Sequence, residues 1–181
     1  NRALTEIQIR QMMNQEIYDD GGVLKGKEVN LPISGLAWSD LSGYYQMNQV
    51  SDISSGSLIS SNGNAIDGTL RAMSTFQDET APIPYETISS GDWDDPNTWL
   101  YGNARSIPNS FGIDGTTLID WNIIKIQNEI TVQRSTKVSS LIIDGGALTV
   151  ANTDPEDGHS LTVDDYLYLV TSDSRLILEG E

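Results

Sequence analysis

Four oxygen-bearing side chains in one loop-rich stretch could hold a calcium ion: Asp52, Asn62, Asn64 and Asp67. Calcium binds about six to eight oxygen atoms, which flexible loops supply from carboxylates, amides and backbone carbonyls. The spacing does not match an EF-hand, whose ligands occupy fixed positions in a loop of about twelve residues. Asn-Gly and Asp-Gly steps in this stretch are also typical of tight turns, which is the alternative interpretation. No cofactor is certain from the sequence, and calcium is the candidate.

The single histidine, His159, follows a run of turn-forming residues that extends from Asn152 to Gly158. It could act as a general base or as a metal ligand. A catalytic triad is not available to it, because the sequence has no G-x-S-x-G nucleophile elbow and no second histidine. We favour the interpretation that His159 is a solvated loop residue.

Four carboxylates near the ends of predicted strands could serve glycoside hydrolysis or polysaccharide lysis: Asp144, Asp164, Asp165 and Asp173. Most glycoside hydrolases use a pair of carboxylates. Acidic residues directly after a strand are also ordinary turn residues, and a base and a cationic partner are missing here. We therefore predict no catalytic residue and no enzymatic activity.

Aromatic side chains are a second candidate for ligand binding, because sugar rings stack on them. The candidates are Trp38, Tyr44, Tyr45, Trp93, Trp99 and Trp121. Tryptophan carries a large apolar area and belongs to the core of a β-protein more often than to a binding face. Both interpretations stay open at this point.

Charge and composition limit the partners of the chain. Its 181 residues contain 26 Asp and Glu against 10 Lys and Arg, a formal net charge of −16. Nucleic acid and anionic membranes require a positive surface, so we expect neither as a partner. Cysteine is absent, which excludes disulfides and thiolate chemistry. No apolar run approaches the roughly 18 residues of a membrane span, and the first residues do not show the basic-then-apolar pattern expected of a secretion leader. We expect a segment of a longer protein whose targeting signals lie elsewhere.

The elements that position these residues fall into three zones. Apolar residues spaced three to five apart predict an amphipathic helix from Ala3 to about Tyr18, capped by Thr5. We expect its apolar stripe of Leu4, Ile7 and Ile17 to dock on a sheet. The paired glycines Gly21 and Gly22 end the helical spacing of apolar residues. Residues 23–86 predict few, short strands, and the proline-containing stretch Thr80–Tyr85 predicts an extended linker.

The third zone, residues 87–181, contains short apolar pairs in strict alternation, which places each pair on one face of a strand. The run Leu141–Asp144 is echoed twenty residues later by Leu161–Asp164, the scale of solenoid repeats. Short strands without intervening helices predict a parallel β-helix, and a β-sandwich of antiparallel hairpins is the alternative. The last strand, around Arg175 to Glu179, is expected to leave its edge and half a core uncovered. The pairs are Ile124/Ile126, Ile130/Val132, Leu141/Ile143, Leu148/Val150, Leu161/Val163, Leu167/Leu169 and Leu176/Leu178.

Three groups of motifs resemble known families. The stretch from Arg2 to Met13 resembles the "RALTxxEI" helix that closes laminin-G-like, concanavalin-type modules. The stretch Trp38–Met47, with Asp52–Gly56 and Asp67–Leu70, resembles the opening of such a module. The run Gly91-Asp92-Trp93 with Thr98-Trp99 is similar to "G-x-W…xTW" regions of giant cell-surface proteins from Bacteroidetes-type bacteria. Those proteins are adhesins or gliding-motility filaments exported by the type 9 secretion system.

The resemblance implies an all-β chain with three parts. Residues 1–22 would be the C-terminal helix of a laminin-G-like module, residues 23–86 a strand and loop segment resembling such a module, and residues 87–181 the start of a truncated parallel β-helix. It implies a non-catalytic segment of a large, secreted cell-surface adhesin that serves surface attachment or gliding. The implied partners are other domains of the same chain, a secretion channel or surface-anchoring proteins, and, as an option, polysaccharide. The alternative is the N-terminal part of a β-helix carbohydrate-active enzyme, a polysaccharide lyase or glycoside hydrolase.

Overall fold

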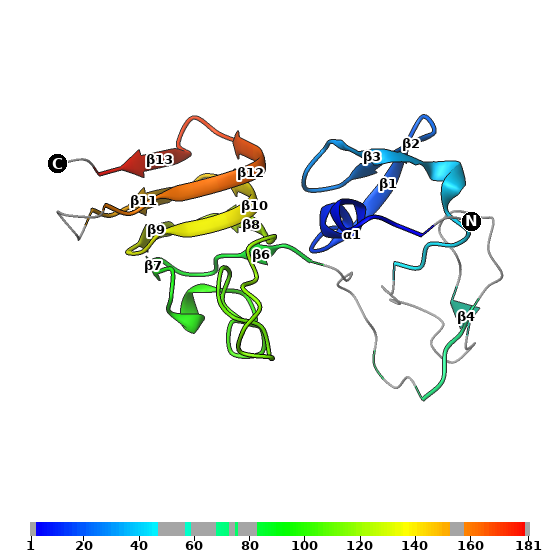
Figure 1. The fold of residues 1–181 in the computed structure, drawn as a ribbon, viewed down its shortest axis with the longest axis horizontal. Helices are drawn as coiled ribbons and strands as arrows, with labels where there is room; N and C mark the ends of the chain where they lie inside the picture. The colour runs from blue at the N-terminus through cyan, green and yellow to red at the C-terminus, as the bar shows by residue number, and fades with distance from the viewer. Residues whose placement is uncertain are drawn as a thin grey trace. The chain divides into compact units, whose positions relative to one another are not determined.

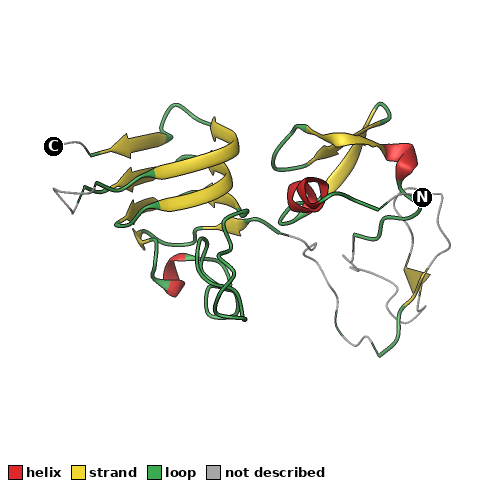
Figure 2. Ribbon diagram, viewed as in Figure 1, coloured by secondary structure: helices red, strands yellow, loops and turns green. Residues whose placement is uncertain are grey.

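The computed structural model of this chain describes residues 3–46, 57–58, 68–72, 75, 83–152 and 158–179. The chain divides into two compact units, Asn1–Ile83 and Pro84–Glu181. Most of the described secondary structure is β-strand, and the described residues include one short α-helix (Figure 2). The predicted all-β class with a short N-terminal helix is therefore confirmed.

The helix of unit 1, α1 (Glu6–Met12), begins at the predicted threonine cap. The Gln8 amide donates to the Thr5 hydroxyl at 3.3 Å, and the Thr5 amide donates to the Gln8 side-chain oxygen at 2.9 Å. This reciprocal capping box satisfies two of the backbone N–H groups that a helix start leaves without intrahelical acceptors.

The predicted length of the helix is wrong, because α1 ends at Met12 and not at Tyr18. Met13 is already extended, with a ψ of 144°, and Asn14 follows with a positive φ of 64°, so the backbone cannot continue the helix. Ile17 then starts a strand, so it shares no face with Leu4 and Ile7, which are exposed. The buried helix residue is Gln8, whose side-chain amide donates to the Ser34 carbonyl at 2.7 Å. The predicted apolar stripe is wrong for the same reason.

Three antiparallel strands follow α1, in the order β1-β2-β3. They are β1 (Ile17–Asp20), β2 (Val23–Gly26) and β3 (Pro32–Ala37), and their core is Ile17, Leu24, Ile33 and Leu36. Gly21 and Gly22 form the β1–β2 turn with positive φ values of 63° and 94°, typical of a type I′ hairpin. The paired glycines thus reverse the chain in a β-hairpin. The domain boundary that we expected between residues 22 and 23 falls in the turn of this hairpin.

A 3₁₀ turn, η1 (Trp38–Asp40), comes after β3, and the short strand β4 (Ser57–Leu58) pairs with β5 (Gly68–Thr69).

Unit 2 contains two four-stranded sheets in which every neighbouring pair is parallel (Figure 1). The chain alternates between the sheets, so that β6 and β7 form a first pass, and each later pass adds one strand to each sheet. A β-sandwich of antiparallel hairpins, the alternative from the sequence, would require antiparallel neighbours, whereas the neighbours within these two sheets are parallel. The first sheet holds β6 (Tyr85–Glu86), β8 (Ile123–Ile126), β10 (Thr136–Ile143) and β12 (Leu161–Leu169). The second holds β7 (Gly91–Asp92), β9 (Glu129–Val132), β11 (Ala147–Val150) and β13 (Arg175–Leu178).

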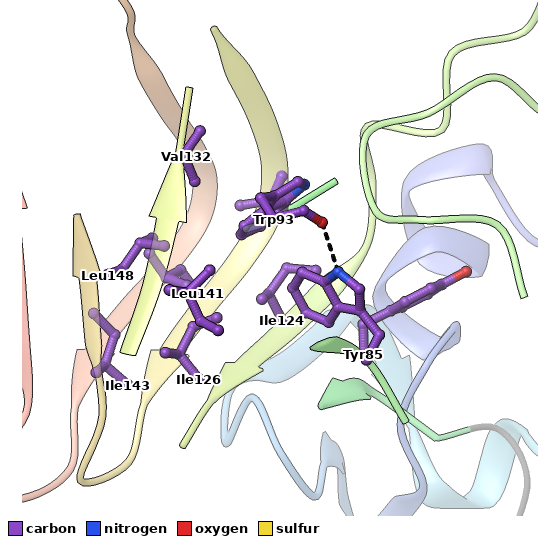
Figure 3. Close-up of a cluster of buried hydrophobic side chains, with 11 residues drawn as sticks. Tyr85, Trp93, Ile124, Ile126, Val132, Leu141, Ile143 and Leu148 are labelled. Carbon is purple, nitrogen blue, oxygen red and sulfur yellow. Dashed lines mark hydrogen bonds between the residues drawn. The ribbon is translucent and has the colours of Figure 1, made fainter. Parts of the chain in front are cut away.

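The core of unit 2 lies between the sheets and is built from the predicted alternating residues (Figure 3). Leu141 lies beside Ile124 in the neighbouring strand, and Leu148 lies beside Ile130. The inward orientation of the first four apolar pairs is confirmed, because all eight residues are buried: Ile124, Ile126, Ile130, Val132, Leu141, Ile143, Leu148 and Val150.

The predicted twenty-residue repeat does not match the strand register. Leu141 pairs with Leu167, whereas Leu161 pairs with Thr136. The runs that looked like two separate strands, from Leu161 and from Leu167, belong to the single strand β12. The register of β10 and β12 also shifts between Val138 and Ser140. Loops of unequal length separate the passes, so a constant sequence offset cannot describe them.

Candidate functional site

The predicted calcium ligands Asp52, Asn62, Asn64 and Asp67 all lie outside the described residues. Within the described ranges, no three or more histidine, aspartate or glutamate side chains gather as a metal-binding group would. The calcium site therefore stays a prediction from the sequence.

The other predicted carboxylates do not gather at one site in the described residues: Asp164 and Asp165 are neighbours in β12, and Asp144 and Asp173 lie in two turns that Ser174 connects. Asp164 forms an ion pair with Lys137 at 3.0 Å, and Lys137 also contacts Asp120 at 3.2 Å. Asp165 accepts a hydrogen bond from the Ser139 hydroxyl at 3.1 Å. These contacts link neighbouring passes of the chain. Asp144 and Asp173 lie in the turns after β10 and before β13, and His159 is half-buried just before β12.

The tryptophans of the G-x-W…TW motif belong to the core. Trp93 is 1% exposed and Trp99 2% exposed, and their rings meet edge to face with centroids 4.9 Å apart. The Trp99 indole donates to the Trp93 carbonyl at 2.7 Å (Figure 3), and the Trp93 indole donates to the Pro108 carbonyl at 2.9 Å. They therefore cannot serve as a sugar-stacking platform. Instead, Trp93 follows β7 directly and closes the core at the first pass.

Arg134, in the turn between β9 and β10, holds the long connection after the tryptophans in place. Its guanidinium donates to both carboxylate oxygens of Asp94 at 2.9 to 3.1 Å and to the Asn109 side-chain oxygen at 2.8 Å. A bidentate guanidinium–carboxylate pair has a fixed geometry. A 3₁₀ turn, η3 (Pro96–Thr98), capped by Asp95, leads into this connection. We assign this cluster to stabilising the first pass.

A pocket of about 350 Å³ with several polar side chains in its lining lies beside the β1–β2 hairpin of unit 1. The hairpin register pairs Ile17 with Gly26, so the next residues, Glu16 and Lys27, also face each other. The Lys27 amide donates to the Glu16 carbonyl at 2.8 Å, which fixes this juxtaposition. The pocket is lined by Glu16, Ile17, Tyr18, Lys27, Asn30 and Gln46.

The electrostatic centre of this pocket is a carboxylate–ammonium pair. The Lys27 ammonium lies 2.5 Å from Glu16 Oε2, and the Glu16 side chain is 7% exposed against 63% for Lys27. The hydrogen bond and the charge of Glu16 raise the pKa of Lys27. Burial raises the pKa of Tyr44, whose hydroxyl accepts a hydrogen bond from the Ile17 amide at 3.2 Å. Glu16 Oε1 is buried and accepts no hydrogen bond from the described residues.

Two further groups of the pocket can form hydrogen bonds. The Tyr18 hydroxyl donates to the Asn30 side-chain oxygen at 2.7 Å, and Gln46 contributes an amide. Sequence analysis missed this pocket because it assigned Glu16 and Tyr18 to a helix. The Gly21-Gly22 step was the available signal, since a hairpin turn there brings residue 16 opposite residue 27.

A second hollow, of about 290 Å³, is lined by Leu4, Ile9, Met12, Met13 and Asn14 of α1 and its surroundings. It is apolar and offers little to a polar ligand. No helix in the described parts of the chain has the length and apolar character needed to cross a membrane.

No known protein family matches this sequence, and neither a curated protein nor a solved structure is detectably similar to it.

Proposed function

We propose that this chain is a non-catalytic structural segment of a large, secreted cell-surface adhesin, in which unit 2 is the beginning of a parallel β-helix. The proposal is supported by the path of the chain, which adds one strand to each of two parallel sheets in every pass. One pass cannot bury its own apolar face, so a stack of passes forms a continuous core. The column Ile130–Leu148–Leu176 is one part of that core.

The difference between the two ends of the stack is the observation that carries the proposal. At the first pass, Trp93 and Trp99 close the core. At the fourth pass, Leu167 is 47% exposed, Leu169 41% and Leu178 68%. Exposed apolar side chains in both strands of one pass suit an interface. This end is therefore suited to carry further passes or another module of a long protein.

The proposed location rests on the resemblance of the Gly91–Trp93 and Thr98–Trp99 motifs to surface proteins exported by the type 9 secretion system. In this interpretation the chain contributes to surface attachment or gliding, and its partners are neighbouring domains and the export or anchoring machinery. The net charge of −16 argues against nucleic acid and anionic membranes as partners. The enzymatic alternative has less support, because Asp164 is paired with Lys137 and Asp165 with Ser139.

The surface location can be tested with an antibody raised against the 181-residue chain. We expect it to label intact cells as strongly as permeabilised cells, and cells without the type 9 machinery to lose the surface label. An antibody against a cytosolic protein is the control for cell integrity. Labelling that requires permeabilisation would contradict the proposal. Deletion of the segment should reduce attachment to surfaces, without any loss of polysaccharide cleavage.

The β-helix can be tested by cross-linking, because the chain has no natural cysteine. Thr149 and Ile177 are register partners in β11 and β13. Parallel neighbours lie about 4.8 Å apart, within the range that a disulfide spans. The double variant Thr149→Cys with Ile177→Cys should therefore oxidise to an intramolecular disulfide. The matched control, Thr149→Cys with Arg175→Cys, is two residues out of register and should not. Equal oxidation of both would reject this stacking.

A further inference from the structure

We propose that the pocket formed by Glu16, Tyr18, Lys27, Asn30 and Gln46 binds one ring of a neutral sugar through adjacent hydroxyl groups. The pocket belongs to unit 1. The proposal therefore does not depend on whether unit 2 continues as a β-helix. It assigns a ligand to residues for which the sequence predicted none.

The first argument is the incomplete hydrogen bonding of Glu16. Its side chain is buried, and Lys27 satisfies one carboxylate oxygen, whereas Oε1 accepts no hydrogen bond from the described residues. A buried acceptor without a donor is unfavourable until a donor reaches it. The Lys27 side chain beside it is 63% exposed, so a ligand in the pocket can reach the ion pair from this side.

The second argument concerns the charge of the ligand. The pair of Glu16 and Lys27 is neutral as a whole, so neither a cation nor an anion gains from it without breaking the 2.5 Å contact. An anionic ligand would also meet the net charge of −16 of the chain. A neutral hydroxyl can donate to the carboxylate while its neighbour accepts from the ammonium. Two adjacent hydroxyls on a ring therefore match this pair.

The third argument is size and lining. The volume of about 350 Å³ lies near the lower limit of about 300 to 1,000 Å³ for small-molecule pockets, which suits a single ring. The Tyr18 ring can provide an apolar face for the C–H groups of a sugar. The amides of Asn30 and Gln46 can each donate and accept, as the remaining hydroxyls require.

The test is a titration of the isotope-labelled 181-residue chain with methyl glucoside, methyl mannoside and methyl galactoside, followed by backbone amide shifts. We expect saturable shifts at the pocket residues for at least one glycoside, with a dissociation constant in the millimolar range. Sodium glucuronate, which carries a carboxylate, should bind more weakly. Absence of shifts with all three glycosides, or tighter binding of glucuronate, would overturn the proposal.

Variants distinguish the pocket from the rest of the surface. Glu16→Gln and Lys27→Met should each weaken glycoside binding about tenfold or more. The matched control is Lys25→Met, because Lys25 lies on β2 two residues before Lys27, pairs with Asp20 at 2.6 Å and does not line the pocket. Gln46→Ala tests the pocket if the substitution of Glu16 disturbs folding. Unchanged binding in both Lys27→Met and Gln46→Ala would reject this site.

Discussion

Trp93 and Trp99 pack edge to face at an interplanar angle of 80°, and the Trp99 indole donates to the Trp93 carbonyl at 2.7 Å. The pair links a ring contact with a satisfied buried N–H group, which is the geometry that lets tryptophan occupy a core. The Thr98 hydroxyl adds a bond to the Asp92 carbonyl at 2.9 Å. The G-x-W…TW motif is thus a local unit in which each polar group of the two indoles has a partner.

Removing one ring of this unit should destabilise unit 2. We expect Trp99→Ala to lower the free energy of unfolding by about 3 to 5 kcal/mol, because the substitution leaves a cavity. Urea unfolding followed by circular dichroism measures it. The control is Phe111→Ala, whose side chain is 60% exposed and whose loss should cost less than about 0.5 kcal/mol. An equal effect of both substitutions would show that the indole pair does not support the core.

The apolar columns predict a graded response to truncation of leucine. Leu148→Ala should cost about 2 to 5 kcal/mol, because Leu148 is fully buried between Ile130 and Leu176. Leu178→Ala should cost less than about 1 kcal/mol, because its side chain is largely exposed. Thermal unfolding of the two variants side by side provides the comparison. A larger loss in Leu178→Ala would contradict the burial pattern.

The hydrogen bonds of Asp114 predict that its loop loses stability in acid. Its carboxylate accepts hydrogen bonds from the Thr117 hydroxyl at 2.6 Å and from the amides of Thr116 and Thr117. These bonds lower the pKa of Asp114 from its ordinary value of 3.8, and the bond from the Thr117 hydroxyl makes the largest contribution. The stabilisation is therefore present above that value and is lost as pH falls below it. The protection factor of the Thr117 amide, which compares its exchange rate with that of an unstructured chain at the same pH, should fall in this acidic range, and in Asp114→Asn it should be low at every pH. A protection factor in Asp114→Asn that still falls in acid would show that another group is responsible.

Lys137 predicts a loss of stability in alkali. Hydrogen bonds to Asp164 and then to Asp120 raise the pKa of Lys137 above its ordinary value of 10.5. A raised pKa means that the stabilisation is present below that value and is lost as pH rises through the folded-state pKa. Lys137→Met should remove this alkaline component of the unfolding curve. The pair is exposed, so high salt should reduce the difference between the two proteins. A difference that does not respond to salt would point to packing of the lysine stem.

The capping box predicts that Thr5→Ala lowers the stability of α1 by about 1 kcal/mol. Amide exchange at Gln8 and Ile9 measures the effect, since Gln8 donates to the Thr5 hydroxyl and Ile9 donates to the Thr5 carbonyl. Thr5→Ser retains the hydroxyl and should exchange as the original chain does. If both substitutions behave alike, the hydroxyl does not cap this helix.

The inward positions of unit 2 could be predicted because strand periodicity depends on neighbouring residues. Ile124 and Ile126 alternate with outward positions, and the same holds for Leu148 and Val150. The register between passes could not be predicted in this way. It depends on how the loops close, so Leu141 meets Leu167 and not the residue twenty positions later. The N-terminal helix was overextended because Ile17 fits both a helical spacing and a strand.

The Glu16–Lys27 pocket could not be predicted while residues 16 to 18 were assigned to a helix. Its lining depends on the Gly21-Gly22 turn, which reverses the chain so that side chains eleven positions apart become neighbours. Gln46 joins the lining from beyond β3, a contact that no local pattern encodes. The aromatic residues were recognised from composition, and the structure was needed to assign Trp93 and Trp99 to the core.

The stacking of parallel passes gives unit 2 a stepwise response to force. Each pass is attached to its neighbours through the strand pairs of the two sheets. Force that pulls on one strand would separate its pass from the neighbouring pass before it reached the next one. Because the neighbours separate one after another and not all together, such a stack would yield in small steps and dissipate load gradually.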